Sequence, residues 1–239
     1  RPSVAAFQHY TRIVARQIES VLEALYSTPA GKNTIVIVLA DHGDGMGSHR
    51  MVTKQVSFYE EMTNVPFIIA GPGIHPRQKP VEDLLTQPTI DLLPTLCELA
   101  GIPVPSSKPG ISLAPFLKGE KQKRQHPYAA SEWHSEYEVT VSPGRMIRSP
   151  RYKYTHYLEG NGEELYDMLK DKGERRNLAH DPKYSKILAE HRALLDDYIR
   201  RTQDDYRSLK VEADKRWRSH APGYPNHEGP CARDIINRK

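Results

Sequence analysis

The residues of this chain best equipped for chemistry are Asp41 and His42, which stand between an apolar run and a glycine-rich stretch. A carboxylate oxygen beside an imidazole nitrogen is a ligand pair compatible with Mg²⁺, Mn²⁺, Zn²⁺ or Ca²⁺. Three glycines within residues 43–47 would let the backbone pass close to a ligand, because glycine has no side chain. Lys54, thirteen residues after Asp41, offers a compact cation suited to a tetrahedral oxyanion such as sulfate or phosphate. Together these residues indicate a site for a divalent metal and an oxyanion.

A bare Asp-His-Gly sequence also has a purely structural interpretation. Asp41 would cap a loop and His42 would be a hydrogen-bonded histidine of the core, and on these residues alone both interpretations stay open. Two ligands are too few for a metal site, so others must come from elsewhere. Two further histidines have similar alternatives. His49 lines the oxyanion pocket or holds the loop through a hydrogen bond, and His134 reaches a substrate ring or belongs with Trp133 to the packing.

The elements that would position these residues are those of an α/β protein. Residues 35–40 form a continuous aliphatic run, which predicts a strand buried on both faces, as in parallel sheets. Ligands of open α/β sheets bind just beyond the carboxyl ends of such strands, which is where Asp41 and His42 lie. A second apolar strand is predicted over 65–70, and helices are predicted over 3–27, 89–100 and 113–117.

The chain changes character near the polar, mostly basic stretch 120–125, which is typical of a linker or domain edge. Short apolar segments separated by turn residues then predict a small antiparallel sheet over 128–133, 145–148, 152–158 and 164–168, followed by a helix over 183–201. We therefore expect three parts: a large α/β domain over 1–122, a small sheet-and-helix subdomain over 123–206, and an extended tail over 207–239.

Length and composition argue against several classes of protein. The 239 residues, of which 38% are hydrophobic, are enough for a substantial core. A net charge of +4, set against 34 Lys and Arg and 30 Asp and Glu, does not favour a nucleic-acid partner. No apolar run reaches the roughly 18 residues of a membrane helix, and the opening Arg1-Pro2-Ser3 shows no signal-peptide pattern. We expect no nucleic acid, no membrane span and, with two cysteines, no disulfide framework.

Several motifs follow one another in a fixed order along the chain. They are Asp41-His42-Gly43, then Lys54 with Tyr59-Glu60-Glu61, then Val65-Pro66-Phe67-Ile68-Ile69 with Gly71-Pro72-Gly73. Later motifs are Gly110-Ile111-Ser112-Leu113, Glu164-Leu165-Tyr166-Asp167, and Asn177-Leu178 after Glu174. Their order and spacing resemble the sulfatase family of the alkaline-phosphatase superfamily, and the resemblance extends over about residues 3–205.

The resemblance implies a fold, a cofactor and a role for each motif residue. The fold would be part of an alkaline-phosphatase-like sandwich, with a mixed or parallel sheet flanked by helices and a small antiparallel-sheet-and-helix C-terminal subdomain. Asp41 and His42 would bind the divalent metal, usually Ca²⁺ in sulfatases, and Lys54 would contact the sulfate and stabilise charge on the leaving oxygen. Family members often have Asn or Gln in place of His42. A Mn²⁺- or Zn²⁺-dependent phosphonate monoester or phosphodiester hydrolase of the same superfamily is therefore the enzymatic alternative.

Part of the family's active site does not occur in this sequence. Sulfatases take their nucleophile from a Cys or Ser in a C/S-x-P-x-R segment, which is oxidised to formylglycine, and neither Cys97 nor Cys231 lies in such a segment. The chain therefore resembles the C-terminal half of a sulfatase. We expect it to be inactive alone, with the N-terminal half of the same enzyme as partner and a sulfated carbohydrate or aryl sulfate as substrate. A non-catalytic binding subunit is the other alternative, and family members are often periplasmic, secreted or lysosomal.

Overall fold

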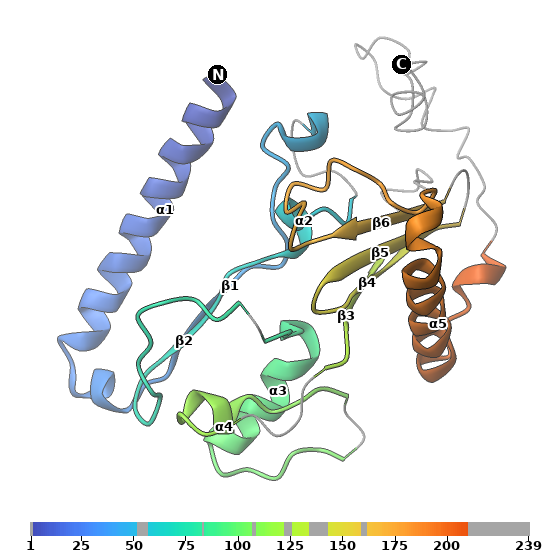
Figure 1. The fold of residues 1–239 in the computed structure, drawn as a ribbon. Coiled ribbons are helices and arrows are strands. Elements are labelled where there is room, and N and C mark those ends of the chain that lie inside the picture. Colours follow the sequence, from blue (N-terminus) through green and yellow to red (C-terminus); the bar gives the residue numbers. More distant parts are fainter. Residues whose placement is uncertain are drawn as a thin grey trace. The chain divides into compact units, whose positions relative to one another are not determined.

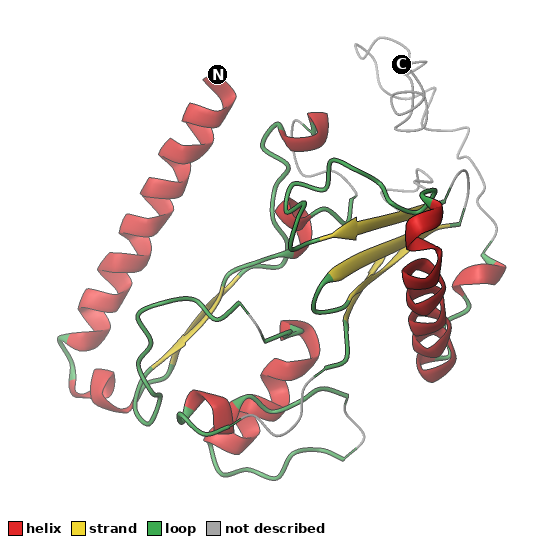
Figure 2. Ribbon diagram, in the orientation of Figure 1, coloured by secondary structure: helices red, strands yellow, loops and turns green. Residues whose placement is uncertain are grey.

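The structure of this chain is a computed structural model with two compact units, Arg1–Ala129 and Ala130–Lys239. The first unit holds helices and a two-stranded ladder, and the second holds a four-stranded sheet with a long helix (Figures 1 and 2). The three-part division expected from the sequence, with boundaries after residues 122 and 206, stays a prediction. The structure describes residues 2–51, 57–82, 84–106, 109–121, 126–133, 143–158 and 162–209.

Helix α1, Pro2–Tyr26, opens the first unit and confirms the helix predicted there. Apolar side chains recur along it at intervals of three and four residues, which places them in one stripe. The stripe is exposed, since Tyr10 is 66% accessible, Val14 52% and Val21 67%. The short 3-10 helix η1, Pro29–Asn33, packs against α1 and leads into the first strand. A contiguous apolar stripe of this length is typical of a surface that another part of a protein covers.

Strand β1, Val36–Leu39, pairs antiparallel with β2, Phe67–Ala70, and Leu39 lies opposite Phe67. The prediction that this aliphatic run is buried on both faces, as in a parallel sheet, is wrong for this chain. Leu39 is 40% exposed and Ile68 is 57% exposed. An aliphatic run is buried only where helices and further strands cover it, and within the described ranges β1 has a single neighbouring strand.

Short helices complete the first unit: η2, Ser48–Arg50; α2, Glu60–Thr63; α3, Pro88–Leu99; and α4, Ala114–Leu117. The carboxylate of Asp91, fully buried in α3, fastens this helix to the chain that follows. It accepts from the Ile111 N–H at 2.8 Å and bonds His126 Nε2 at 2.7 Å. Among the helices of the described residues, none is both long and apolar enough to cross a bilayer.

The second unit is built on the antiparallel sheet predicted from the sequence, in the order β3-β4-β5-β6. Its elements are β3, Ala129–Trp133; β4, Gly144–Arg148; β5, Tyr152–Tyr157; β6, Glu163–Asp167; η3, Pro182–Tyr184; α5, Ser185–Thr202; and η4, Tyr206–Ser208. Helix α5 packs on β4 and β5 (Figure 1). Ile147, Leu165 and Leu195 are fully buried, and they form the centre of this small core.

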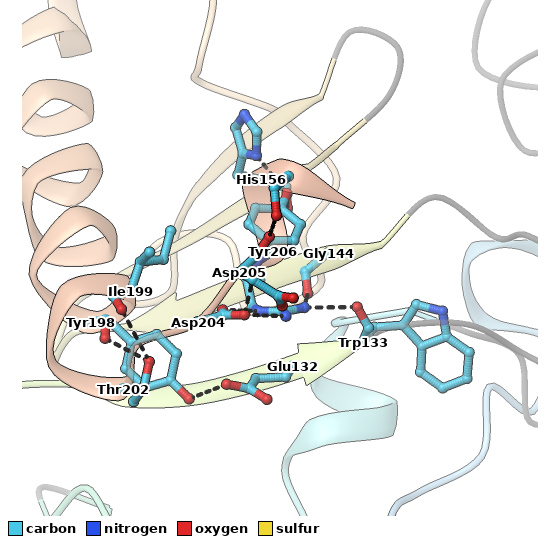
Figure 3. A network of polar contacts seen from close by, with 12 residues as sticks. Glu132, Trp133, Gly144, His156, Tyr198, Ile199, Thr202, Asp204, Asp205 and Tyr206 are labelled. Atoms are coloured by element: carbon cyan, nitrogen blue, oxygen red, sulfur yellow. Dashed lines mark hydrogen bonds and ion pairs between the residues drawn. The ribbon is translucent and has the colours of Figure 1, made fainter. Parts of the chain in front are cut away.

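A polar network ties the end of α5 to the sheet (Figure 3). The Arg145 guanidinium, 4% exposed, donates to both carboxylate oxygens of Asp204, at 2.6 and 2.9 Å, and lies over the Tyr206 ring. The Tyr206 hydroxyl donates to the His156 carbonyl at 2.8 Å. Bidentate pairs of this kind are strong because two charge-assisted bonds form in one plane. From residue 210 onward, the tail expected over 207–239 lies outside the described residues.

Candidate active site at the end of β1

The side chains of Asp41 and His42 converge just beyond the carboxyl end of β1. His42 Nδ1 lies 2.8 Å from the Gly43 carbonyl oxygen, so this nitrogen carries a proton and donates it. The other ring nitrogen, Nε2, lies 3.5 Å from Asp41 Oδ2. The His42 backbone N–H donates to Asp41 Oδ1 at 2.9 Å and so orients the carboxylate. As a result, a carboxylate oxygen and an imidazole nitrogen face each other at the strand end.

These two atoms fit a divalent cation. Ligand atoms at right angles around an ion, with bonds of about 2.1–2.4 Å, lie about 3 Å apart, which is close to the separation of Oδ2 and Nε2. A carboxylate oxygen and an imidazole nitrogen meet at this separation either through a shared proton or through a bound cation. The Asp41 side chain is 85% exposed and that of His42 is 41% exposed, so an ion has access to both.

The backbone at position 43 passes so close to the backbone of residues 61 and 62 that only glycine fits there. Its N–H donates to the Met62 carbonyl at 2.9 Å, and a Cβ on Gly43 would lie only 1.8 Å from the Glu61 carbonyl oxygen. No side chain fits in that space. The contact fastens Asp41 and His42 to the end of α2, and this explains why glycine follows them.

The backbone of loop 44–51 is strained. Met46, His49 and Arg50 adopt left-handed φ angles of 46°, 47° and 63°. Residues with a Cβ cost of order 1 kcal/mol each in this region, so surrounding contacts must hold them there. One such contact is Asp44 Oδ1, which accepts from the Met46 N–H at 3.0 Å. Strain of this kind is concentrated at functional sites.

His49 belongs to a neighbouring set of contacts with Tyr59 and Glu61. The rings of His49 and Tyr59 are stacked, with centroids 3.6 Å apart and planes 2° apart. His49 Nε2 lies 4.0 Å from Glu61 Oε2. Tyr59 thus orients His49 and holds the loop that carries it; the motif predicts that Tyr59 fixes the loop but not that it stacks on His49. The two rings meet only because the strained loop folds back, and left-handed residues other than glycine leave no signal in a sequence.

The structure describes three of the five predicted site residues. Asp41 and His42 are brought together, and His49 is held beside the α2 segment that also anchors Gly43. Lys54 and His134 lie outside the described residues. The catalytic, metal-binding and substrate-binding roles of these residues stay predictions.

The chain is similar to known sulfatases. Residues 47–201 match the family model described as N-sulphoglucosamine sulphohydrolase, C-terminal. The Delta 4,5-hexuronate-2-O-sulfatase of Bacteroides thetaiotaomicron is 75% identical over 239 residues, which are 100% of this chain and 50% of that protein. The solved structure of a 2-O GAG sulfatase is 76% identical, with a TM-score of 0.87, over 97% of this chain and 50% of that chain.

The similarity of fold extends beyond sulfatases. The structure of the phosphonate monoester hydrolase of Agrobacterium radiobacter, 25% identical, matches with a TM-score of 0.63 over 76% of this chain and 38% of that chain. The fold and the motif residues thus define part of an alkaline-phosphatase-like hydrolase fold, as expected. Within that class, the chain belongs to the sulfatase family. It spans half the length of the hexuronate-2-O-sulfatase that it matches.

Proposed function

We propose that this chain is the C-terminal part of an enzyme that hydrolyses sulfate esters. The observation that carries the proposal is the meeting of Asp41 Oδ2 and His42 Nε2, 3.5 Å apart, in a chain of the sulfatase family. Such a pair suits a divalent cation, which would polarise a bound sulfate group. The fold does not need two electron-rich side chains at this position, so their presence favours an enzyme over a non-catalytic subunit.

Each predicted site residue has a task in this reaction. Asp41 and His42 hold the cation, which the family resemblance makes Ca²⁺, whereas the imidazole also suits Mn²⁺ or Zn²⁺. The Lys54 ammonium contacts the sulfate oxygens and stabilises charge on the leaving alcohol oxygen. His49, oriented by its aromatic stack, lines the sulfate pocket, and His134 contacts the organic part of the substrate.

The substrate that we propose is a 2-O-sulfated hexuronate or a short saccharide that ends in one. The support is the identity of 75% over the whole chain to a protein named for this sulfated sugar. A 2-O-sulfated hexuronate carries its sulfate on C2 and a carboxylate on C5, so it offers two anionic groups for recognition by cationic side chains.

The nucleophile and the remaining metal ligands come from an N-terminal part of the protein. This part of the proposal is supported by length, because the chain corresponds to half of its relative. It is also supported by the exposed apolar stripe of α1 and by the uncovered faces of β1 and β2. Large exposed apolar surfaces of this kind mark interfaces.

The test combines this chain with an N-terminal part that carries a C/S-x-P-x-R segment, and compares the hydrolysis of an aryl sulfate and an aryl phosphodiester. We expect sulfate ester hydrolysis to dominate. Lys54→Ala should lower kcat about 10²- to 10³-fold, because a preorganised charge is lost, while the exposed Lys186→Ala should change it less than twofold.

Two results would contradict the proposal. Faster hydrolysis of the phosphodiester would favour the phosphonate or phosphodiester hydrolase, a class that shares this fold. Hydrolysis of neither ester would favour a non-catalytic subunit. A normal kcat in Lys54→Ala would remove this residue from the mechanism while leaving the reaction itself in place.

A further inference from the structure

A hollow of about 580 Å³ lies on the first unit, between α4 and the loop that follows β2. Side chains that give it chemical character are His75, Arg77, Lys79, Glu82 and Phe116. It is open to solvent over most of its boundary, so a ligand in it stays partly exposed. Arg77 and Lys79 are permanent cations and Glu82 is the one carboxylate among these side chains, so the charge of the hollow is positive. A positive hollow favours an anionic ligand.

The loop that carries the cations is braced against α4 and the residues after it. The His75 N–H donates to the Leu117 carbonyl at 2.6 Å. A Cβ on Gly119 would lie 3.2 Å from His75 Cγ, so the imidazole rests directly on this glycine. The Arg77 guanidinium lies 4.3 Å from the centroid of the Phe116 ring, a favourable cation–π distance. These contacts lower the conformational freedom that the loop would lose on binding.

The hollow and the Asp41–His42 pair lie at opposite ends of the β1–β2 ladder. Ala70, the last residue of β2, lies opposite Val36, the first residue of β1. The loop of the hollow follows β2, and Asp41 follows β1. Because the two strands are antiparallel, the loop and Asp41 leave the ladder at opposite ends. The ladder between them is about 10 Å long, at about 3.3 Å per residue. A small ligand in the hollow is therefore not held by Asp41 or His42.

We propose that this hollow binds an acidic saccharide through sulfate or carboxylate groups that pair with Arg77 and Lys79. A guanidinium presents a planar fork of donors to such groups, and an ammonium adds a point charge. The Glu82 carboxylate adds an acceptor for the hydroxyl groups of a sugar. The choice of a saccharide rests on the proposed function, because a hydrolase of sulfated uronides meets such chains and a second contact would retain them.

The test measures binding without turnover. The 239-residue chain is titrated calorimetrically, at 0.15 M salt, with a chondroitin sulfate tetrasaccharide, its desulfated counterpart and inorganic sulfate. We expect Arg77→Ala/Lys79→Ala to raise the Kd for the sulfated tetrasaccharide at least tenfold. The matched control Arg175→Ala/Lys186→Ala removes one exposed arginine and one exposed lysine from the second unit, and should change that Kd less than twofold.

Equal weakening by both double variants would show non-specific attraction to positive charge and would overturn the proposal. So would binding of inorganic sulfate as tightly as the tetrasaccharide. With the N-terminal part present, the tetrasaccharide should protect residues 75–82 from hydrogen exchange, and an absence of protection would also overturn the proposal. Failure of the proposed function is seen separately: the combined protein would hydrolyse neither ester or would prefer the phosphodiester, while the dependence of binding on Arg77 and Lys79 would persist.

Discussion

His42 owes its orientation to a single backbone carbonyl. Because Nδ1 donates to the Gly43 oxygen at 2.8 Å, Nε2 is left to face Asp41. Histidines that bind metals commonly donate their second N–H to a carbonyl or carboxylate, which fixes the ring and raises the basicity of the ligand atom. The orientation of the His42 ring is thus set by a backbone oxygen of the chain itself. It depends on Gly43 lying where it does, against the end of α2.

We therefore expect Gly43→Ala to destabilise the first unit more than Gly47→Ala. The new Cβ at Gly43 meets the Glu61 carbonyl oxygen at 1.8 Å, so the backbone must move, at a cost of about 2–4 kcal/mol. Gly47 has a φ of 90° and open space around it, so alanine there adds only backbone strain of about 1–2 kcal/mol. Urea denaturation of the two variants measures the difference. Equal losses of stability would contradict the role given to Gly43.

Glu164 in β6 makes the stability of the second unit depend on pH. Burial, and secondly the like charge of Glu174, raise its pKa from 4.5 to about 7, although Lys153 opposes the shift. Lys153 is itself paired with Glu174 at 2.9 Å, with both side chains 1% exposed. Because the folded pKa is raised, the protonated acid stabilises the fold below the unfolded pKa of 4.5, and this contribution is lost as pH rises through about 7.

Glu164→Gln stays neutral at every pH and should therefore be more stable than the native chain above pH 7. The expected gain is up to about 3 kcal/mol, and it should shrink toward zero near pH 4. The free energy of unfolding of both proteins, measured from pH 4 to 8, checks this. Two parallel curves would show that Glu164 ionises freely in the folded chain.

At the scale of elements, residue patterns that act over a few positions were enough to predict the helices and strands. They were not enough to predict which of these elements are buried. Helix α1, helix α5 and the strands of the small sheet follow from apolar spacing and turn residues, which act within a few positions. The burial of β1 depends on what covers it, and that information is not local. The pair Asp41–His42 was predictable from its motif, whereas the stack of His49 on Tyr59 depends on loop backbone angles that the sequence does not encode visibly.

The apolar stripe of α1 should matter for assembly rather than for the fold of this chain. Val14→Asp removes apolar surface that is already 52% exposed, so the melting temperature of the 239-residue chain should change by less than about 2 °C. The same change should weaken association with the N-terminal part at least tenfold, because a charge would be buried in an apolar interface. Ser20→Asp, on the same helix but off the stripe, adds the same charge and is the control. Equal weakening by both variants, measured by calorimetry, would contradict this interface.

At the scale of the whole molecule, the chain contains part of the proposed site and part of a core. It carries Asp41, His42 and Lys54, but no C/S-x-P-x-R segment that would supply a formylglycine nucleophile. It also exposes the aliphatic faces of β1 and β2. This chain does not span the other half of its relative. If that half supplies the nucleophile segment and also covers the exposed faces of β1 and β2, one cause explains both features. Catalysis and burial should then be completed together.

Calcium titration and sulfate release, measured on one set of variants, test the central claim most directly. The protein that combines this chain with its N-terminal part should bind Ca²⁺ and release sulfate from a 2-O-sulfated hexuronate. Asp41→Ala and His42→Ala should each weaken Ca²⁺ binding at least tenfold and lower kcat by about 10²-fold or more, whereas Glu98→Ala, an exposed carboxylate of α3, should change neither. Unchanged binding and turnover in both site variants would show that Asp41 and His42 hold no catalytic cation.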